Sequence, residues 1–200
     1  TNDAFLAINS GKKIDKKFLS RIQSGIDIVC QNLAKNIARD GEGANCLLEV
    51  LVQGAKHDDD AIMIAKSICN SALVKTAIHG CDPNWGRIIS AAGNSGVKFN
   101  LNAVDLYIGD YQILEKGMLN QYDSQKVSNY MKSRMKGKYL VEDILRIVIN
   151  LNSGNTNTFT QNFASSGTGL VAFNPTFIAK SKIQNGDEGL LPDQNHQHIQ

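Results

Sequence analysis

The feature that most constrains the fold is a short and almost wholly apolar run, CLLEVLVQG, from Cys46 to Gly54. It is too short for a long helix, and its leucines and valines suit a β-strand that is mostly covered on both faces. A long helix precedes it, because apolar residues recur at three- and four-residue steps between Asp15 and Arg39, and Gly41 is placed to end that helix. The local order is therefore a helix followed by a buried strand.

The acids Asp58, Asp59 and Asp60 could form a metal-binding cluster. They stand directly before an apolar helical pattern, however, and acids in that place are typical of a helix N-terminus, which is the favoured interpretation. Farther along, the sequence predicts a strand over ALVKTAIHG (72–80), a helix from Trp85 to Ala92 after the Asp82-Pro83 turn, a hairpin turning at Gly109-Asp110, a helix over 123–135 and a strand over DILRIVINL (143–151).

The amino-acid composition of the chain changes after Gly154. The stretch NTNTFTQNFASSGTG is polar and low in complexity, and the last residues have no apolar period of either kind. We therefore expect one structured region over residues 1–154 and an atypical, poorly ordered polar tail over residues 155–200.

Composition excludes several classes of function. With 42% hydrophobic and 20% charged residues, the chain can form one compact domain or a large piece of one. It holds no apolar stretch of the roughly 18 to 20 residues that a membrane span needs, and no signal-peptide pattern at its start, so we expect a cytoplasmic protein. The 21 basic and 19 acidic residues are scattered, which gives no electrostatic case for nucleic acid or an anionic membrane as a partner.

Neither the cysteines nor the histidines have the spacing of a metal or catalytic site. No CxxC pair occurs, so buried free thiols are favoured over metal ligands for the four cysteines, Cys30, Cys46, Cys69 and Cys81. The four histidines, His57, His79, His196 and His198, show no zinc-ligand or Ser-His-Asp spacing and are interpreted as structural or solvent-exposed. We expect no bound metal.

Two stretches could carry chemistry. In RDGEGAN, residues 39–45, Glu42 lies between two glycines, where a carboxylate could hold a cationic amine; from spacing alone, an exposed side chain in an ordinary helix cap is the favoured alternative. In KTAIHGCDPNWGRIISAAGNSG, residues 75–96, Asp82 could cap a helix, Trp85 could pack in the core and Arg87 could pair with an acid. Alternatively the loop walls a pocket, with Asn84 or Arg87 meeting a substrate carboxylate.

The motifs in these stretches also resemble those of a known protein family. RDGEGA before a strand, then LVKTA, GCDPNWGRI and AAGNSGV in that order, are similar to the bifunctional ornithine acetyltransferase and N-acetylglutamate synthase family of arginine biosynthesis, over about residues 1 to 154. The resemblance implies an α/β fold, here a mixed sheet with packed helices that forms a fragment of the family's β chain. It also implies a precursor that cuts itself into α and β chains, two copies of each assembling as an α2β2 heterotetramer.

The resemblance further implies an acyl transfer in two steps. The threonine exposed by self-cleavage takes the acetyl group from N-acetylornithine, ornithine leaves, and glutamate then collects the acetyl group. This ping-pong scheme needs an oxyanion site, which the family's α chain carries, and it needs no metal or organic cofactor. Acetyl-CoA is a possible co-substrate.

The resemblance bears on individual residues as well. Glu42 matches the family's substrate-contacting glutamate, although Asn45 stands where a threonine is usual. Thr1 could be an N-terminal nucleophile, as in an N-terminal-threonine amidohydrolase that uses its own α-amino group as base. TNDAFLAINSG instead matches a family motif that follows the cleavage site by roughly thirty residues, so we expect Thr1 to be an internal β-chain threonine and the nucleophile to lie upstream. The asparagine and final threonine or serine that help bind substrate at the family's C-terminus have no counterpart after Gly154.

Overall fold

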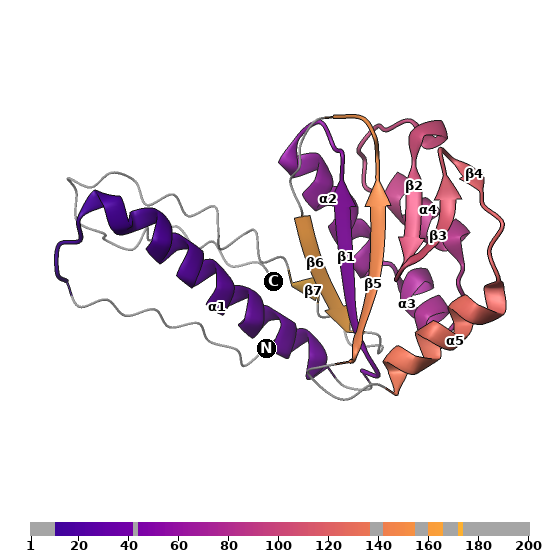
Figure 1. Cartoon of the computed structure of the whole chain (residues 1–200), viewed down its shortest axis with the longest axis horizontal. Helices are drawn as coiled ribbons and strands as arrows, with labels where there is room; N and C mark the ends of the chain where they lie inside the picture. The colour runs from indigo at the N-terminus through magenta and orange to yellow at the C-terminus, as the bar shows by residue number, and fades with distance from the viewer. Residues whose placement is uncertain (1–10, 42–43, 137–141, 155–159, 166–171, 174–200) are drawn as a thin grey trace, which may run out of the picture.

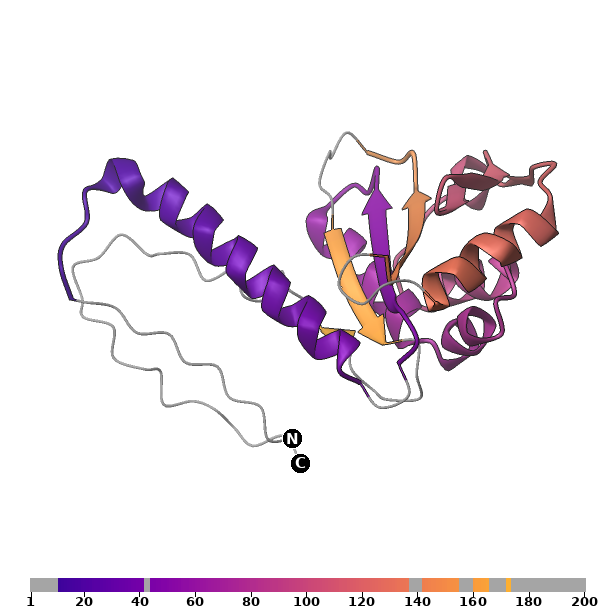
Figure 2. The same ribbon diagram turned by 60° about the horizontal axis from the view of Figure 1, so that its bottom comes forward.

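A computed structural model describes residues 11–41, 44–136, 142–154, 160–165 and 172–173. A short 3-10 helix, η1 (Lys16–Phe18), leads into the long helix α1 (Leu19–Arg39), as the apolar stripe predicts. The side chains of Cys30, Ala34 and Ala38 are buried, four residues apart on one face of α1. In Figures 1 and 2 one end of α1 meets the sheet and the other extends away from it.

The sheet has seven strands in the order β4-β3-β2-β5-β1-β6-β7 and is mixed, which confirms the predicted architecture. The central strands β1 and β5 run parallel, with Val50 opposite Ile147, and every other pair is antiparallel. The strands are β1 (Leu47–Gln53), β2 (Asp105–Ile108), β3 (Tyr111–Glu115), β4 (Met118–Leu119), β5 (Ile144–Asn150), β6 (Thr160–Ser165) and β7 (Ala172–Phe173).

The main core lies between one face of this sheet and four helices. Leu48, Val50 and Val52 of β1 belong to it, together with buried residues of each helix. These helices are α2 (Asp58–Asn70), α3 (Ala72–His79), α4 (Trp85–Gly93) and α5 (Ser124–Met135), and a 3-10 turn, η2 (Leu101–Ala103), leads into β2. On the opposite face Leu47 packs with Ala38 of α1, so β1 is covered on both sides, as its composition predicts.

Most predicted elements are confirmed. Asp58 begins α2, so the acidic run is a helix start rather than a metal cluster. Gly109, with φ 59°, turns the β2–β3 hairpin, and Asp123 accepts hydrogen bonds from the first backbone N–H groups of α5. The strand predicted over 72–80 is wrong, because this segment is α3: the hydroxyl of Ser71 caps it.

The helical spacing explains the correction at α3. Val74, Ala77 and Ile78 fall at i, i+3 and i+4 and are buried in the core, which outweighs the strand preference of the β-branched residues in this run. No single described helix is long and apolar enough to cross a membrane. The bent pair of α2 and α3, with 57° between the two, passes that test by length and composition only.

Part of the predicted polar tail is built into the sheet. Strand β6 pairs antiparallel with β1, and β7 pairs with β6. Backbone pairing needs no apolar period, so the sequence pattern could not reveal these two strands. The remaining tail residues lie outside the described part of the chain.

Candidate functional site

The turn that joins α1 to β1 is the centre of the candidate site. The backbone N–H of Ala44 donates to the carbonyl of Gly41 at 2.9 Å, which closes a four-residue turn. Glu42, the predicted substrate-binding carboxylate, and Gly43 are its two central residues and lie outside the described residues. The location of the turn is therefore known from Gly41 and Ala44, the two described residues that flank it.

A buried ion pair holds the chain before this turn. Arg39, the last residue of α1, donates from Nε and Nη2 to the two carboxylate oxygens of Asp143 at 2.7 and 3.1 Å. The side chains are only 7% and 6% exposed, so the pair is shielded from water. Asp143 also accepts a 2.8 Å bond at its carbonyl from the N–H of Leu47, at the start of β1. A bidentate arginine–carboxylate pair of this kind is geometrically specific.

A second contact holds the chain after the turn. The side-chain amide nitrogen of Asn45 lies 3.3 Å from Nδ1 of His79, the last residue of α3. From the sequence, His79 is interpreted as structural or solvent-exposed, and no spacing rule connects it to Asn45, 34 positions away. The structure thus joins the RDGEGAN stretch to the KTAIHG stretch.

The loop between α3 and α4 is closed by backbone bonds. The N–H groups of Cys81 and Asp82 donate to the carbonyls of Ile78 and Ala77, both at 2.9 Å, in a Schellman arrangement. Cys81 takes the left-handed conformation, with φ 52°, while the preceding Gly80 keeps φ −76°. A cysteine in the position that usually holds glycine stores backbone strain next to the candidate site.

The three residues singled out in this loop have different surroundings. Asn84, not Asp82, caps α4 by accepting from the N–H of Arg87 at 3.2 Å, and its amide donates to the Asp82 carboxylate at 3.1 Å. Arg87 pairs with no acid in the described structure; its Nη1 donates to the carbonyl of Leu73 and to Oγ1 of Thr76, both at 3.1 Å. It therefore ties α4 to α3.

Trp85 also differs from the core position considered for it, because it is 37% exposed at the first turn of α4. Trp85 is the first residue of α4 and directly follows the capping Asn84.

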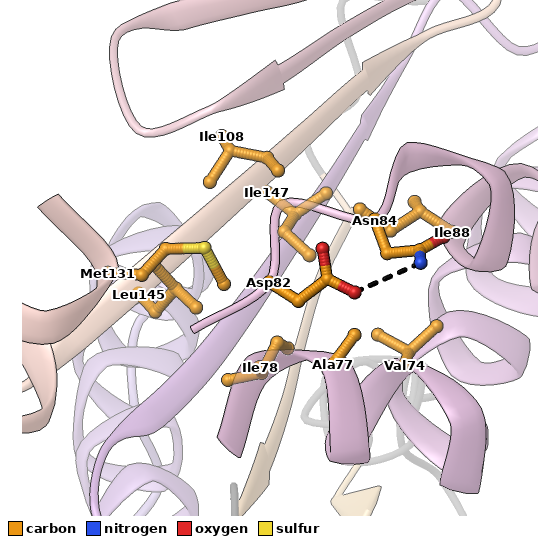
Figure 3. Close-up of a pocket in the computed structure, with 10 residues that line it drawn as sticks. All are labelled: Val74, Ala77, Ile78, Asp82, Asn84, Ile88, Ile108, Met131, Leu145 and Ile147. Carbon is orange, nitrogen blue, oxygen red and sulfur yellow. Dashed lines mark hydrogen bonds between the residues drawn. The ribbon is translucent and has the colours of Figure 1, made fainter. Parts of the chain in front are cut away.

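Asp82 and Asn84 do line a pocket, and Arg87 does not (Figure 3). The remaining wall is apolar and comes from α3, α4, α5, β2 and β5. The cavity is small, because its volume is about 10 Å³, roughly the space needed to hold one water molecule. Burial raises the pKa of the nearby Tyr122 phenol, and the Asp82 carboxylate raises it further.

Lys75, in the KTAIHG stretch, is a buried charged residue that the sequence pattern did not indicate. Lys75 is only 8% exposed, and burial lowers the pKa of its ammonium group. Burial likewise raises the pKa of the nearby Cys69 thiol, although the positive charge of Lys75 opposes this shift. The sequence could have indicated the burial of Lys75 only through the helical pattern of its neighbours, because position 75 lies on the buried side when the segment is a helix.

The other candidates are placed as follows. All four cysteines are free and buried, as predicted. Within the described ranges, no group of three or more His, Cys, Asp or Glu side chains could hold a metal ion. His57 precedes α2 and makes no side-chain cap bond. Thr1, His196 and His198 lie outside the described residues, so their predictions stay untested.

Comparison with known proteins gives consistent results. A model of the ArgJ family matches residues 1–166. The chain is 80% identical over 154 residues to the arginine biosynthesis bifunctional protein ArgJ of Prochlorococcus marinus subsp. pastoris (strain CCMP1986 / NIES-2087 / MED4), covering 77% of this chain and 38% of that protein. It is 42% identical over 160 residues to the protein of the same name from Dehalococcoides mccartyi (strain CBDB1), with the same two coverages.

Among solved structures, the crystal structure of the arginine biosynthesis bifunctional protein ArgJ from Bacillus halodurans is similar, with a TM-score of 0.70 and 36% sequence identity. The match covers 79% of this chain and 70% of that one. The chain spans less than two fifths of the length of these curated relatives.

Proposed function

The chain belongs to the ArgJ family, and from this premise we propose that it is part of an acetyltransferase of arginine biosynthesis that moves the acetyl group of N-acetylornithine to glutamate. The observation that carries the proposal is the turn at Gly41–Ala44, which is held on both sides by contacts from distant elements. The family resemblance assigns the substrate contact to Glu42, which stands between Gly41 and Ala44 in the sequence.

The proposed reaction proceeds through an acetyl-threonine. The hydroxyl of a threonine attacks the acetyl carbonyl, its α-amino group takes the proton, and the C–N bond breaks as ornithine leaves. The amine of glutamate then attacks the ester, N-acetylglutamate leaves, and the hydroxyl is restored. In this proposal the nucleophile and the oxyanion donors lie outside these 200 residues, in the α chain and in an upstream part of the β chain, within a cytoplasmic α2β2 assembly that needs no metal or organic cofactor.

Two further roles belong to the proposal. Glu42 binds the substrate amine, and the Asp82–Asn84 loop shapes the wall of the site from α3 and α4. Acetyl-CoA is a possible second acetyl donor, which would suit the word bifunctional in the names of the relatives.

The test of Glu42 uses a full-length chimera in which this chain's matching 154 residues replace those of the Prochlorococcus marinus relative. Glu42→Gln keeps the size of the side chain and removes its charge, so it should raise the KM for N-acetylornithine by about ten-fold or more, as expected for a lost charge-assisted bond. Glu115→Gln, an exposed position on β3, is the matched control and should leave KM unchanged. Equal KM values for Glu42→Gln and the parent would refute the assignment.

The alternative is an amidohydrolase whose nucleophile is Thr1. It predicts that the isolated 200-residue chain forms an acyl-enzyme, visible by mass spectrometry, and that Thr1→Ala abolishes it. The proposed function predicts no acyl-enzyme on the isolated chain in either variant.

A further inference from the structure

We propose that Arg146 anchors an interface with the part of an ArgJ protein that lies outside the matched 154 residues, where it binds an acidic side chain. The inference rests on the family membership and not on the role of Glu42, so the two can fail separately. It concerns the face of the sheet opposite the main core.

The first observation is a buried carboxylate between two cations. Glu49, in the middle of β1, has a fully buried side chain. Its Oε2 accepts a hydrogen bond from Nε of Arg146 on β5 at 2.5 Å, and Nζ of Lys35 on α1 lies 3.4 Å from its Oε1. Burying a carboxylate is costly unless cations compensate its charge. Here two cations surround one carboxylate, which leaves a net positive charge on the cluster.

The second observation is the orientation of Arg146. Its side chain is 50% exposed, although the glutamate that it binds is fully buried. The guanidinium is planar and rigid, so the bond at Nε also fixes the directions of the two Nη groups. Within the described residues, these two groups make no hydrogen bond. An arginine held in this way can bind a further carboxylate in a bidentate arrangement.

The third observation is the surface around Arg146. Val148 follows it on the same face of β5, and Tyr107 of β2 pairs with Val148; both side chains are half-buried. Figure 1 looks onto this face: α2, α3 and α4 lie behind the sheet, and no described helix crosses β5 or β2 in front. We call these three residues the Arg146 face. An arginine beside apolar and aromatic side chains is typical of the core of a protein interface.

The length of the family's chain identifies the occupant. The matching 154 residues make up 38% of the Prochlorococcus marinus relative, so more than three fifths of that protein lie outside them. A sheet buries its apolar surface against another layer, and the helices of the main core cover only the opposite face. The net positive charge of the Glu49 cluster complements an acidic group, whereas a second copy of the Arg146 face would bring two positive clusters together. We therefore assign this face to an Asp or Glu side chain of the remaining part of the protein.

The first experiment measures whether Arg146 is covered in the full-length chimera without any substitution. Phenylglyoxal modifies guanidinium groups, and peptide mass spectrometry follows its rate at each arginine. We expect Arg146 to react about ten-fold or more slowly than the same residue after unfolding in urea, because an interface core excludes water and solutes. Arg39, with a 7% exposed side chain, is the buried reference.

Two outcomes of this experiment would overturn the inference. The first is a smaller reduction of the rate at Arg146 than expected. The second is protection of Arg146 only after glutamate is added, which would indicate a site for a free carboxylate instead of an interface.

The second experiment identifies the partner by carbodiimide cross-linking. Arg146→Lys keeps the positive charge and supplies an amine that carbodiimide can join to a contacting carboxylate. We expect an amide bond between position 146 and an Asp or Glu outside the matched 154 residues. Lys132, exposed on α5, is the control and should form no such bond. Bonds to Glu49 alone, or none at all, would contradict the proposal.

Adding Glu49→Gln to Arg146→Lys tests whether the glutamate orients the cation. This change removes the competing internal carboxylate, so an amine that needed no orientation would form the external bond more often. The proposal predicts a several-fold lower yield, because the amine is no longer held in place; a higher yield would refute the orienting role. None of these results depends on the KM of Glu42→Gln, so failure of the interface and failure of the proposed function are distinguishable.

Discussion

The ion pair between Arg39 and Asp143 joins residues 104 positions apart and fastens the end of α1 to the start of β5. No spacing rule connects them, yet the pair fixes the entrance to the candidate site. From the sequence, Arg39 stands at the end of a helix and at the start of the RDGEGAN stretch, whereas Asp143 is only the start of a strand.

Breaking this pair should be costly, because the remaining charge would stay buried. We predict that Arg39→Ala lowers the free energy of unfolding by about 3 to 5 kcal/mol, measured by urea denaturation. The control is Lys17→Ala, which breaks an exposed pair with Asp15 and should have little effect on stability. Similar losses for the two variants would contradict the structure at this site.

The backbone conformations of Gly80 and Cys81 lead to a second prediction about stability. Gly80 has a helical φ, and a Cβ added there would meet the carbonyl of Thr76 at an ordinary 3.4 Å. Gly80→Ala should therefore be neutral or stabilising by up to about 1 kcal/mol in thermal unfolding. Cys81→Gly should change stability by less than about 1 kcal/mol, because glycine removes the strain of the left-handed φ but also removes a buried side chain from the core. Destabilisation by Gly80→Ala would show that Gly80, rather than Cys81, adopts the left-handed conformation.

At the scale of elements, α3 is where the sequence-based prediction was wrong. Its run of valine, threonine and isoleucine favours a strand by composition, but the hydroxyl of Ser71 caps a helix and the buried residues follow a helical spacing. Because this segment is a helix, Lys75 lies on its buried side and His79 is its last residue. The burial of Lys75 and the position of His79 therefore both follow from the helical conformation of α3.

The helix that follows, α4, provides the prediction at this scale. Asn84 caps α4, so Asn84→Ala should cost about 1 kcal/mol of stability, while Asn84→Ser keeps an accepting oxygen without adding a charge beside Asp82 and should cost much less. Asn94→Ala, at the exposed far end of the same helix, is the control and should have little effect. Equal losses for Asn84→Ala and Asn84→Ser, measured by thermal unfolding, would argue against the cap.

At the scale of the whole molecule, stability should depend on pH through Lys75. Burial lowers the pKa of this lysine in the folded state, so the unfolded chain binds more protons in the interval between the lowered value and the ordinary one. The free energy of unfolding should therefore contain a part that rises with pH through this interval and is flat below it. Lys75→Met should remove that part; urea unfolding of both proteins at several alkaline pH values tests it, and equal slopes would contradict it.

The exposed apolar side of α1 is the other property of the whole molecule with a measurable consequence. Ile26, Val29 and Leu33 are 43%, 57% and 46% exposed, so the chain expressed alone should be poorly soluble. Replacing all three with glutamine should reduce light scattering at equal concentration without lowering stability, whereas Ala34→Gln, on the buried side, should destabilise the fold. A soluble, cooperatively unfolding monomer of the unmodified chain would refute the prediction.

The sequence by itself determined the elements whose signal is local. The stripe of α1, the two-sided burial of β1, the glycine turn after β2 and the acidic start of α2 all follow from neighbouring residues, and the GEGA and DPNWGR motifs identified the family. Tertiary structure alone decided that α3 is a helix, that β6 and β7 complete the sheet, and that Arg39 meets Asp143 and Asn45 meets His79. The reason is physical: such pairings depend on which distant segments pack together, and side-chain periodicity within one segment carries no information about its partner.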